Sequence, residues 1–163
     1  MNGKLGAGLM APTNIIVNGD FAAGDANWSG NDIEADYSES AYIGANPGNT
    51  VAEMDGASGQ TTVMEQSLTI SGAMTTTLTF DTALRTASNG DAGSEGYTVE
   101  ILDSSNNVVA TQDYYPTDNV LSGESLDVTF PSGGTYTVRF TELGPDNSLG
   151  AIVDNISMLV CFV

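Results

Sequence analysis

The sequence predicts a single all-β domain, folded as an antiparallel β-sandwich or jelly roll. Short runs rich in β-branched residues alternate apolar and polar side chains with a period of two, which is typical of half-buried antiparallel strands. Clusters of Gly, Asn, Asp and Ser separate these runs at short intervals, as in sandwiches and jelly rolls. No window shows a convincing helical period, and 163 residues suffice for one domain with a substantial core.

Nine strands are expected in chain order. In the fourth of them, Leu78, Phe80 and Leu84 fall on one face, and mostly polar side chains fall on the other. Turns are expected at 89–91, 104–107 and 132–134, where the residues suit hairpins or loops. The expected strands are 15–17, 51–54, 63–70, 75–84, 97–102, 108–112, 125–130, 135–141 and 151–160.

Two segments fall outside this pattern. Residues 1–13 are small, Gly-rich and aperiodic, so we interpret them as an N-terminal arm or linker that precedes a jelly roll over 14–163. Residues 22–49 form the longest strand-poor stretch and contain Trp28, Tyr37 and Tyr42. Because long loops on a rigid β scaffold usually carry binding function, this stretch is the first place to expect a site.

The charge balance and the missing residue types exclude several functions. Asp and Glu number 21 against three basic residues, for a net charge of −18, which repels nucleic acid and anionic membranes and suits divalent cations. The absence of histidine removes Ser-His-Asp catalysis and histidine-ligated zinc. Cys161 is the only cysteine, so no intrachain disulfide forms.

The location of the protein is expected to be extracellular or on the surface of a particle, either a virion or a cell. The first 14 residues contain one lysine and no apolar stretch, so they do not form a classical secretory signal peptide. No stretch is apolar and long enough to insert into a membrane.

Four motifs, in order, resemble one family. They are N-I-I-V-N-G-D-F at 14–21, followed by Trp28; V-A-E-M-D-G at 51–56; T-L-T-F-D-T-A-L-R at 77–85; and G-P-D-N-S-L-G-A-I-V-D-N-I-S-M at 144–158. Together they resemble the galactose-binding-like jelly rolls, and within them carbohydrate-binding module families four, nine and twenty-two. Two positions depart from the family: Ala22 stands in place of a glutamate, and threonines at 75–77 replace an aromatic residue.

The last three residues, 161–163, resemble the start of a Hint (hedgehog/intein) autoprocessing domain. In that interpretation Cys161 would attack the peptide bond that precedes it. The alternative, which we favour, is that Cys161 is a small hydrophobic residue that finishes the last strand.

The resemblance implies a structural calcium ion that ties the first strand to the last. Carried over to this chain, its ligands are Asp20, carbonyl oxygens within 28–30, and Asp154, with Asp55 as a further candidate. The alternative is that Asp20 caps a turn and Asp154 accepts backbone hydrogen bonds. A calcium site predicts that EDTA lowers the melting temperature.

A sugar site is expected where aromatic faces meet a few polar groups. The candidates are Tyr37, Tyr42, Arg85, Tyr114 and Tyr115, with both members of the last pair assigned to a loop before Pro116. We interpret Trp28 as core. Arg85 could instead form an exposed salt bridge with Asp81, which would contribute little.

The sequence therefore predicts a non-catalytic carbohydrate-binding or adhesion module whose partner is a glycan or polysaccharide. No motif selects a catalytic pair among the 21 acids, so an enzyme is not expected. The alternative is a structural or decoration protein of a larger assembly, such as a phage virion, with other subunits as partners. Neither nucleic acid nor membrane insertion is expected.

Overall fold

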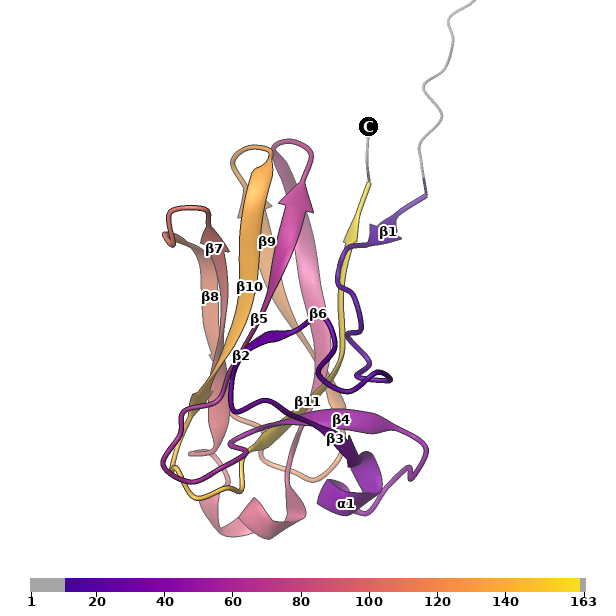
Figure 1. The fold of residues 1–163 in the computed structure, drawn as a ribbon, viewed down its shortest axis with the longest axis vertical. Coiled ribbons are helices and arrows are strands. Elements are labelled where there is room, and N and C mark those ends of the chain that lie inside the picture. Colours follow the sequence, from indigo (N-terminus) through magenta and orange to yellow (C-terminus); the bar gives the residue numbers. More distant parts are fainter. Residues whose placement is uncertain (1–10, 162–163) are drawn as a thin grey trace, which may run out of the picture.

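The structure, a computed structural model, describes residues 11–161 and is a sandwich of two antiparallel sheets (Figure 1). The first sheet has the order β3-β4-β11-β6-β9, and β1 pairs with β11 beside that path. Its strands are β1 (Thr13–Asn14), β3 (Glu34–Ser38), β4 (Thr50–Met54), β6 (Met74–Leu84), β9 (Ser122–Phe130) and β11 (Ala151–Val160). The all-β sandwich prediction is confirmed.

The second sheet has five strands in the order β2-β5-β10-β7-β8. They are β2 (Ser29–Asn31), β5 (Val63–Ile70), β7 (Gly96–Asp103), β8 (Val108–Tyr114) and β10 (Gly134–Leu143). Two strands, β5 and β11, begin and end at the predicted residues, and six others extend the predicted runs by one to three residues at one or both ends. Alternating burial along these strands, as in β9 and β10, explains why a period-two pattern located them.

The first predicted strand, 15–17, is wrong in its position. Strand β1 covers Thr13–Asn14, and only the N–H of Ile15 continues the pairing, with Met158 O at 3.0 Å. Val17 instead bonds through both its N–H and its carbonyl to the side-chain amide of Gln66. The arm predicted over 1–13 lies mostly outside the described residues, and Thr13 belongs to the sheet.

The strand-poor stretch 22–49 has more regular structure than predicted, because it contains β2, β3 and the short helix α1 (Glu39–Ile43). A 3-10 helix, η1 (Thr86–Asp91), follows β6. Elements of five or six residues are too short to show a helical period in the sequence. No helix in the described part of the chain is long and apolar enough to cross a membrane.

The main core lies between the sheets and is rich in aromatic rings. Phe80 packs edge-to-face on Tyr114 and Phe140, with ring centroids 4.9 and 5.6 Å away. Trp28 is 7% exposed, contacts Phe140, and donates its indole N–H to a backbone carbonyl. The prediction that Trp28 belongs to the core is confirmed.

A second, smaller core lies on the other face of the six-stranded sheet. It consists of Tyr42, Val51, Ala83 and Ile152, with Ile43 and Leu121 packed against it. Helix α1 supplies Tyr42 and therefore covers one end of this sheet, where η1 and the β10–β11 connection also lie (Figure 1). Several connections thus meet at one end of a rigid sandwich.

Candidate functional site

A pocket of about 290 Å³ lies at this end of the molecule. Its lining residues lie on β3, on α1, directly after β6, and in the β4–β5 and β10–β11 connections. Three of the sugar-binding candidates line it together, although they are far apart in the sequence: Tyr37, Tyr42 and Arg85. The remaining lining residues are Glu34, Ala41, Gly56 and Ser148.

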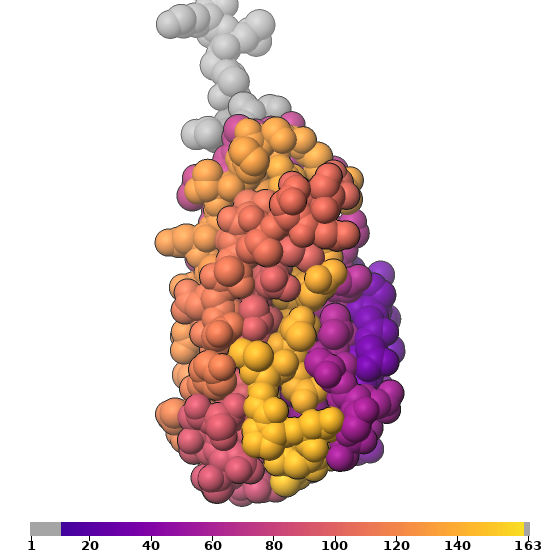
Figure 2. All heavy atoms as spheres, turned by 90° about the vertical axis from the view of Figure 1, so that its left-hand side faces the viewer, coloured from indigo at the N-terminus to yellow at the C-terminus, as the bar shows by residue number. Residues whose placement is uncertain are grey.

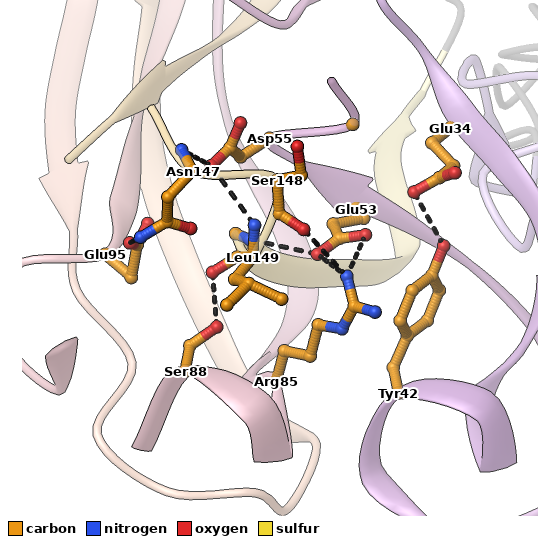
Figure 3. A network of polar contacts seen from close by, with 12 residues as sticks. Glu34, Tyr42, Glu53, Asp55, Arg85, Ser88, Glu95, Asn147, Ser148 and Leu149 are labelled. Atoms are coloured by element: carbon orange, nitrogen blue, oxygen red, sulfur yellow. Dashed lines mark hydrogen bonds and ion pairs between the residues drawn. The ribbon is translucent and has the colours of Figure 1, made fainter. Parts of the chain in front are cut away.

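Arg85 is fixed at the floor of the pocket by one of its terminal nitrogens. Its Nη1 donates to both carboxylate oxygens of Glu53, at 2.7 and 2.9 Å, and to the carbonyl of Ser148 at 3.0 Å (Figure 3). The guanidinium also lies 4.9 Å from the centre of the Tyr42 ring, a favourable cation–π distance. All these hydrogen bonds use Nη1, so the Nε and Nη2 donors are available to a ligand.

The alternative prediction, a salt bridge between Arg85 and Asp81, is wrong. Asp81 instead accepts a hydrogen bond from Asn155 at 2.8 Å. Glu53 pairs with Arg85 because β4 and β6 are both neighbours of β11, which places Glu53 and the end of β6 on adjacent rows of one face. Sequence reasoning did not select Glu53, because its partner lies 32 residues away.

Glu53 is 1% exposed and also accepts the backbone N–H of Gly150 at 2.9 Å. Its burial raises its pKa to about 8, and the neighbouring carboxyl of Glu34 adds to this, while Arg85 opposes it. Glu34 in turn accepts the hydroxyl of Tyr42 at 3.1 Å. Figure 3 shows this Tyr42–Glu34 hydrogen bond beside the Arg85–Glu53 pair, and the cation–π contact between Arg85 and Tyr42 links the two.

Tyr37 provides the exposed aromatic surface of the pocket. Its side chain lies on β3 and is 50% exposed, whereas Tyr42 is 4% exposed. The two rings meet edge-to-face, with centroids 5.7 Å apart. Tyr42 therefore supports Tyr37 and Arg85 from below, and Tyr37 is the ring on which a ligand can stack.

A larger depression of about 530 Å³ lies over the five-stranded sheet, but its chemistry differs. It is lined by Gly30, Asn31, Val63, Glu65, Glu100, Arg139 and Thr141, without an aromatic ring. Arg139 is paired with Glu65 at 2.9 Å and with Glu100 at 4.0 Å. The tyrosine pocket is consequently the better candidate for binding a sugar ring.

Comparison of the sequence with protein-family models and with curated proteins finds no match. Solved structures do match. A family 16 carbohydrate-binding module is 21% identical over 89% of this chain and 99% of its own, with a TM-score of 0.60. The module TmCBM61, solved in complex with β-1,4-galactotriose, is 13% identical over 90% and 97%, with a TM-score of 0.66. The enzymatically active domain of tailspike protein 4 from bacteriophage CBA120 is 17% identical over 90% of this chain and 21% of its own, with a TM-score of 0.59.

The chain has the jelly-roll β-sandwich fold of these carbohydrate-binding modules. The prediction that Tyr114 lies in a loop is wrong. Tyr114 ends β8, is 5% exposed, and stacks on Tyr97 while its hydroxyl donates to a backbone carbonyl. Tyr115 is 44% exposed but is not among the residues that line the tyrosine pocket.

The three metal candidates lie in different places in the jelly roll. Asp20 is exposed and accepts the N–H of Ala22, and Asp154 is buried and accepts from the side chain of Asn49 and the N–H of Asn155. Burial raises the pKa of Asp154 to about 6. Both residues thus make the hydrogen bonds of the alternative interpretation.

Asp55 belongs to a different cluster from the one expected. Within 11–161, one group of three acids has oxygen atoms that all lie within 4.8 Å of one another: Asp55, Glu142 and Asp146. Glu95 lies beside them, and burial together with the charges of nearby acids raises its pKa to about 7. Asp55 alone of the sequence candidates takes part in this group.

Residue Cys161 follows the end of β11 and is exposed. It therefore does not finish the last strand as expected. The two residues after it, which carry the rest of the resemblance to a Hint domain, lie outside the described residues.

Proposed function

We propose that the protein is a non-catalytic carbohydrate-binding module that holds a glycan in the tyrosine pocket. The observation that carries the proposal is the exposed ring of Tyr37 beside Arg85, whose Nη1 is fixed by hydrogen bonds while its Nε and Nη2 donors remain available. Tyr37 would stack on the apolar face of a sugar ring, and the Nε and Nη2 groups of Arg85 would donate to its hydroxyls. The matched modules and the galactotriose bound by TmCBM61 support this assignment.

The glycan is expected to be neutral. The pocket contains Glu34 beside Arg85, and the guanidinium charge is already paired with Glu53. A net charge of −18 repels uronic and other acidic sugars. One exposed ring in a compact pocket suits one or two sugar units better than a long chain lying across a sheet.

Catalysis is not proposed, although the pocket contains two carboxyls. Glycosidases hold their carboxyl pair about 5–9.5 Å apart, with the substrate between them. Glu53 is buried, and both of its carboxylate oxygens accept from Arg85, while Glu34 accepts from Tyr42. This arrangement uses Glu53 to fix the arginine rather than to face a substrate.

A glycan array on the intact protein, followed by calorimetric titration with the best ligand, tests the proposal. Tyr37→Ala should weaken binding about tenfold or more, corresponding to about 1.4 kcal/mol. Arg85→Lys should also weaken it while keeping the charge opposite Glu53. Tyr115→Ala is the matched control, because it removes an equally exposed ring outside the pocket. Binding that is lost in Tyr115→Ala but kept in Tyr37→Ala would show that the site is elsewhere, and no binding to any neutral glycan would refute the function.

A second proposal, supported by the likeness to a phage tailspike domain, is that the jelly roll is carried on the outside of a virion or similar assembly. It would act there as a decoration or adhesion domain exposed to the surroundings of the particle. The mass of the native protein by light scattering tests this, because a closed oligomer is expected for an assembly component and a monomer for a free module.

The structural calcium between the first and last strands also stays a proposal. Its support is that Asp20 and Asn155 line one cavity of about 300 Å³ between these segments. Asp20→Asn should abolish any calcium-dependent rise in melting temperature that arises there.

A further inference from the structure

We propose that Asp55, Glu142 and Asp146 form a divalent-cation site, of the calcium class, that holds the β10–β11 connection in place. The residues come from three separate segments: the residue after β4, the end of β10, and the connection itself. Oxygen atoms of all three lie within 4.8 Å of one another. An ion with oxygen ligands at about 2.3–2.6 Å fits such a spacing.

Two buried carboxylate oxygens, one in this cluster and one beside it, have no partner. Asp55 and Glu95 are both 0% exposed, yet Asp55 Oδ1 and Glu95 Oε2 make no hydrogen bond. The other oxygen of Asp55 is fully used, because it accepts the N–H groups of Asn147 and Leu149 at 2.9 and 3.2 Å. An unpartnered buried carboxylate oxygen is costly, so the free oxygen of Asp55 points to a missing ligand at the cluster.

The neighbouring acids are held in place by one oxygen each. Glu142 accepts the N–H of Thr62 at 2.6 Å through Oε2, and Asp146 accepts the N–H of Gly59 at 2.6 Å through Oδ1. The second oxygen of each carboxylate remains for an ion. Calcium prefers oxygen ligands such as carboxylates, whereas softer metals prefer nitrogen or sulfur ligands.

No protein cation neutralises this cluster within 11–161. The two arginines of this part of the chain are paired elsewhere, Arg85 with Glu53, and Arg139 with Glu65 and Glu100. Three carboxylates therefore lie close together without a counter-charge. A divalent cation would remove this repulsion and give the orphan oxygen of Asp55 a partner.

The cluster is directly connected to the tyrosine pocket. The connection that carries Asp146 also carries Ser148, whose carbonyl accepts from Arg85 and whose hydroxyl accepts from Ser58 N at 2.7 Å (Figure 3). Figure 2 shows this yellow segment at the lower end of the molecule, packed between the connections before β7 and after β4. An ion at Asp146 would fix this connection, and with it one wall of the pocket.

Calorimetric titration of the intact, EDTA-treated and dialysed protein with CaCl₂, without sugar, tests the site directly. We expect saturable binding, and a melting temperature about 5–10 °C higher at a hundredfold excess over Kd. Asp146→Asn should reduce the number of calcium ions bound by one and remove the part of the melting-temperature rise that arises at this cluster. This variant removes one exposed carboxylate, so it should melt no lower than the wild type in EDTA, which separates loss of the ion from loss of the fold.

Asp20→Asn is the matched control, since it removes the same charge from the other proposed calcium site. It should keep the calcium response that Asp146→Asn loses. An unchanged melting curve with calcium, or a response that is lost in Asp20→Asn and kept in Asp146→Asn, overturns the inference.

We further expect glycan affinity to depend on calcium, and this expectation also rests on the proposed function. If calcium binds but no glycan does, the proposed function fails and the cation site stands. If glycan binds equally well with calcium and with EDTA, the link between the two sites fails.

Discussion

At the scale of single residues, polar side chains replace backbone pairing that the strands do not supply. Gln66 is 7% exposed and reaches from β5 to the chain before β2. Its amide accepts the N–H of Val17 at 2.8 Å and donates to the carbonyls of Val17 and Asn27 at 2.9 and 3.2 Å. One side chain thus satisfies three backbone groups of the N-terminal segment.

Gln66→Leu should therefore destabilise the protein by about 1.5–4 kcal/mol, because the substitution removes three part-buried hydrogen bonds to the backbone, each contributing roughly 0.5–1.5 kcal/mol. Denaturant unfolding followed by circular dichroism measures the change. Ser67→Ala, on the neighbouring exposed position, should change stability by less than about 0.5 kcal/mol. Equal effects of the two substitutions would show that the amide of Gln66 does not hold this segment.

At the scale of elements, the β10–β11 connection packs against β4 at a distance that only glycine allows. A Cβ atom on Gly150 would lie 2.4 Å from the carbonyl oxygen of Met54 and 2.7 Å from the Cβ of Asp55. The N–H of Gly150 also donates to Glu53. The missing side chain therefore lets this connection lie directly on the end of β4, beside the acidic cluster.

Gly150→Ala should cost about 1–3 kcal/mol of unfolding free energy, since the strand and the connection must move apart. Gly72→Ala is the control, because a Cβ there meets nothing within 4 Å, and it should be neutral or slightly stabilising. Thermal unfolding of both variants measures the difference. A Gly150→Ala protein as stable as the wild type would contradict the close approach.

The elements also show what a sequence can predict. Strand β5 was predicted to the residue, because burial on one face imposes a period of two. Strand β11 was predicted equally well, although its first four residues are buried on both faces. Tyr114 was misplaced because a Tyr-Tyr-Pro run is typical of loops, whereas β8 continues until Tyr114 fills the core. The meeting of Asp55 with Asp146 joins residues far apart in the chain, and no local pattern encodes such a contact. Tyr37, Tyr42 and Arg85 could be proposed individually, but only the fold brings them together.

At the scale of the whole molecule, stability is expected to depend on negative charge. The net charge is −18 at pH 7, and burial raises the pKa values of Glu53, Glu95 and Asp154 to about 8, 7 and 6. A group whose pKa is higher in the folded state binds its proton more tightly there. It contributes full stability below its unfolded pKa, and this contribution is lost as pH rises through the folded value.

The protein in EDTA should therefore be more stable at pH 5.5 than at pH 8.0, with a melting temperature higher by roughly 5–10 °C. Asp154→Asn should flatten the part of this dependence between about pH 4 and 6, because it removes a buried carboxyl. Asp20→Asn removes the same charge from an exposed position and should leave the slope unchanged. If both variants flatten the curve equally, general repulsion between surface charges sets the pH dependence, and the buried carboxyls do not. A melting temperature that rises from pH 5.5 to 8.0 would contradict the direction of all three pKa shifts.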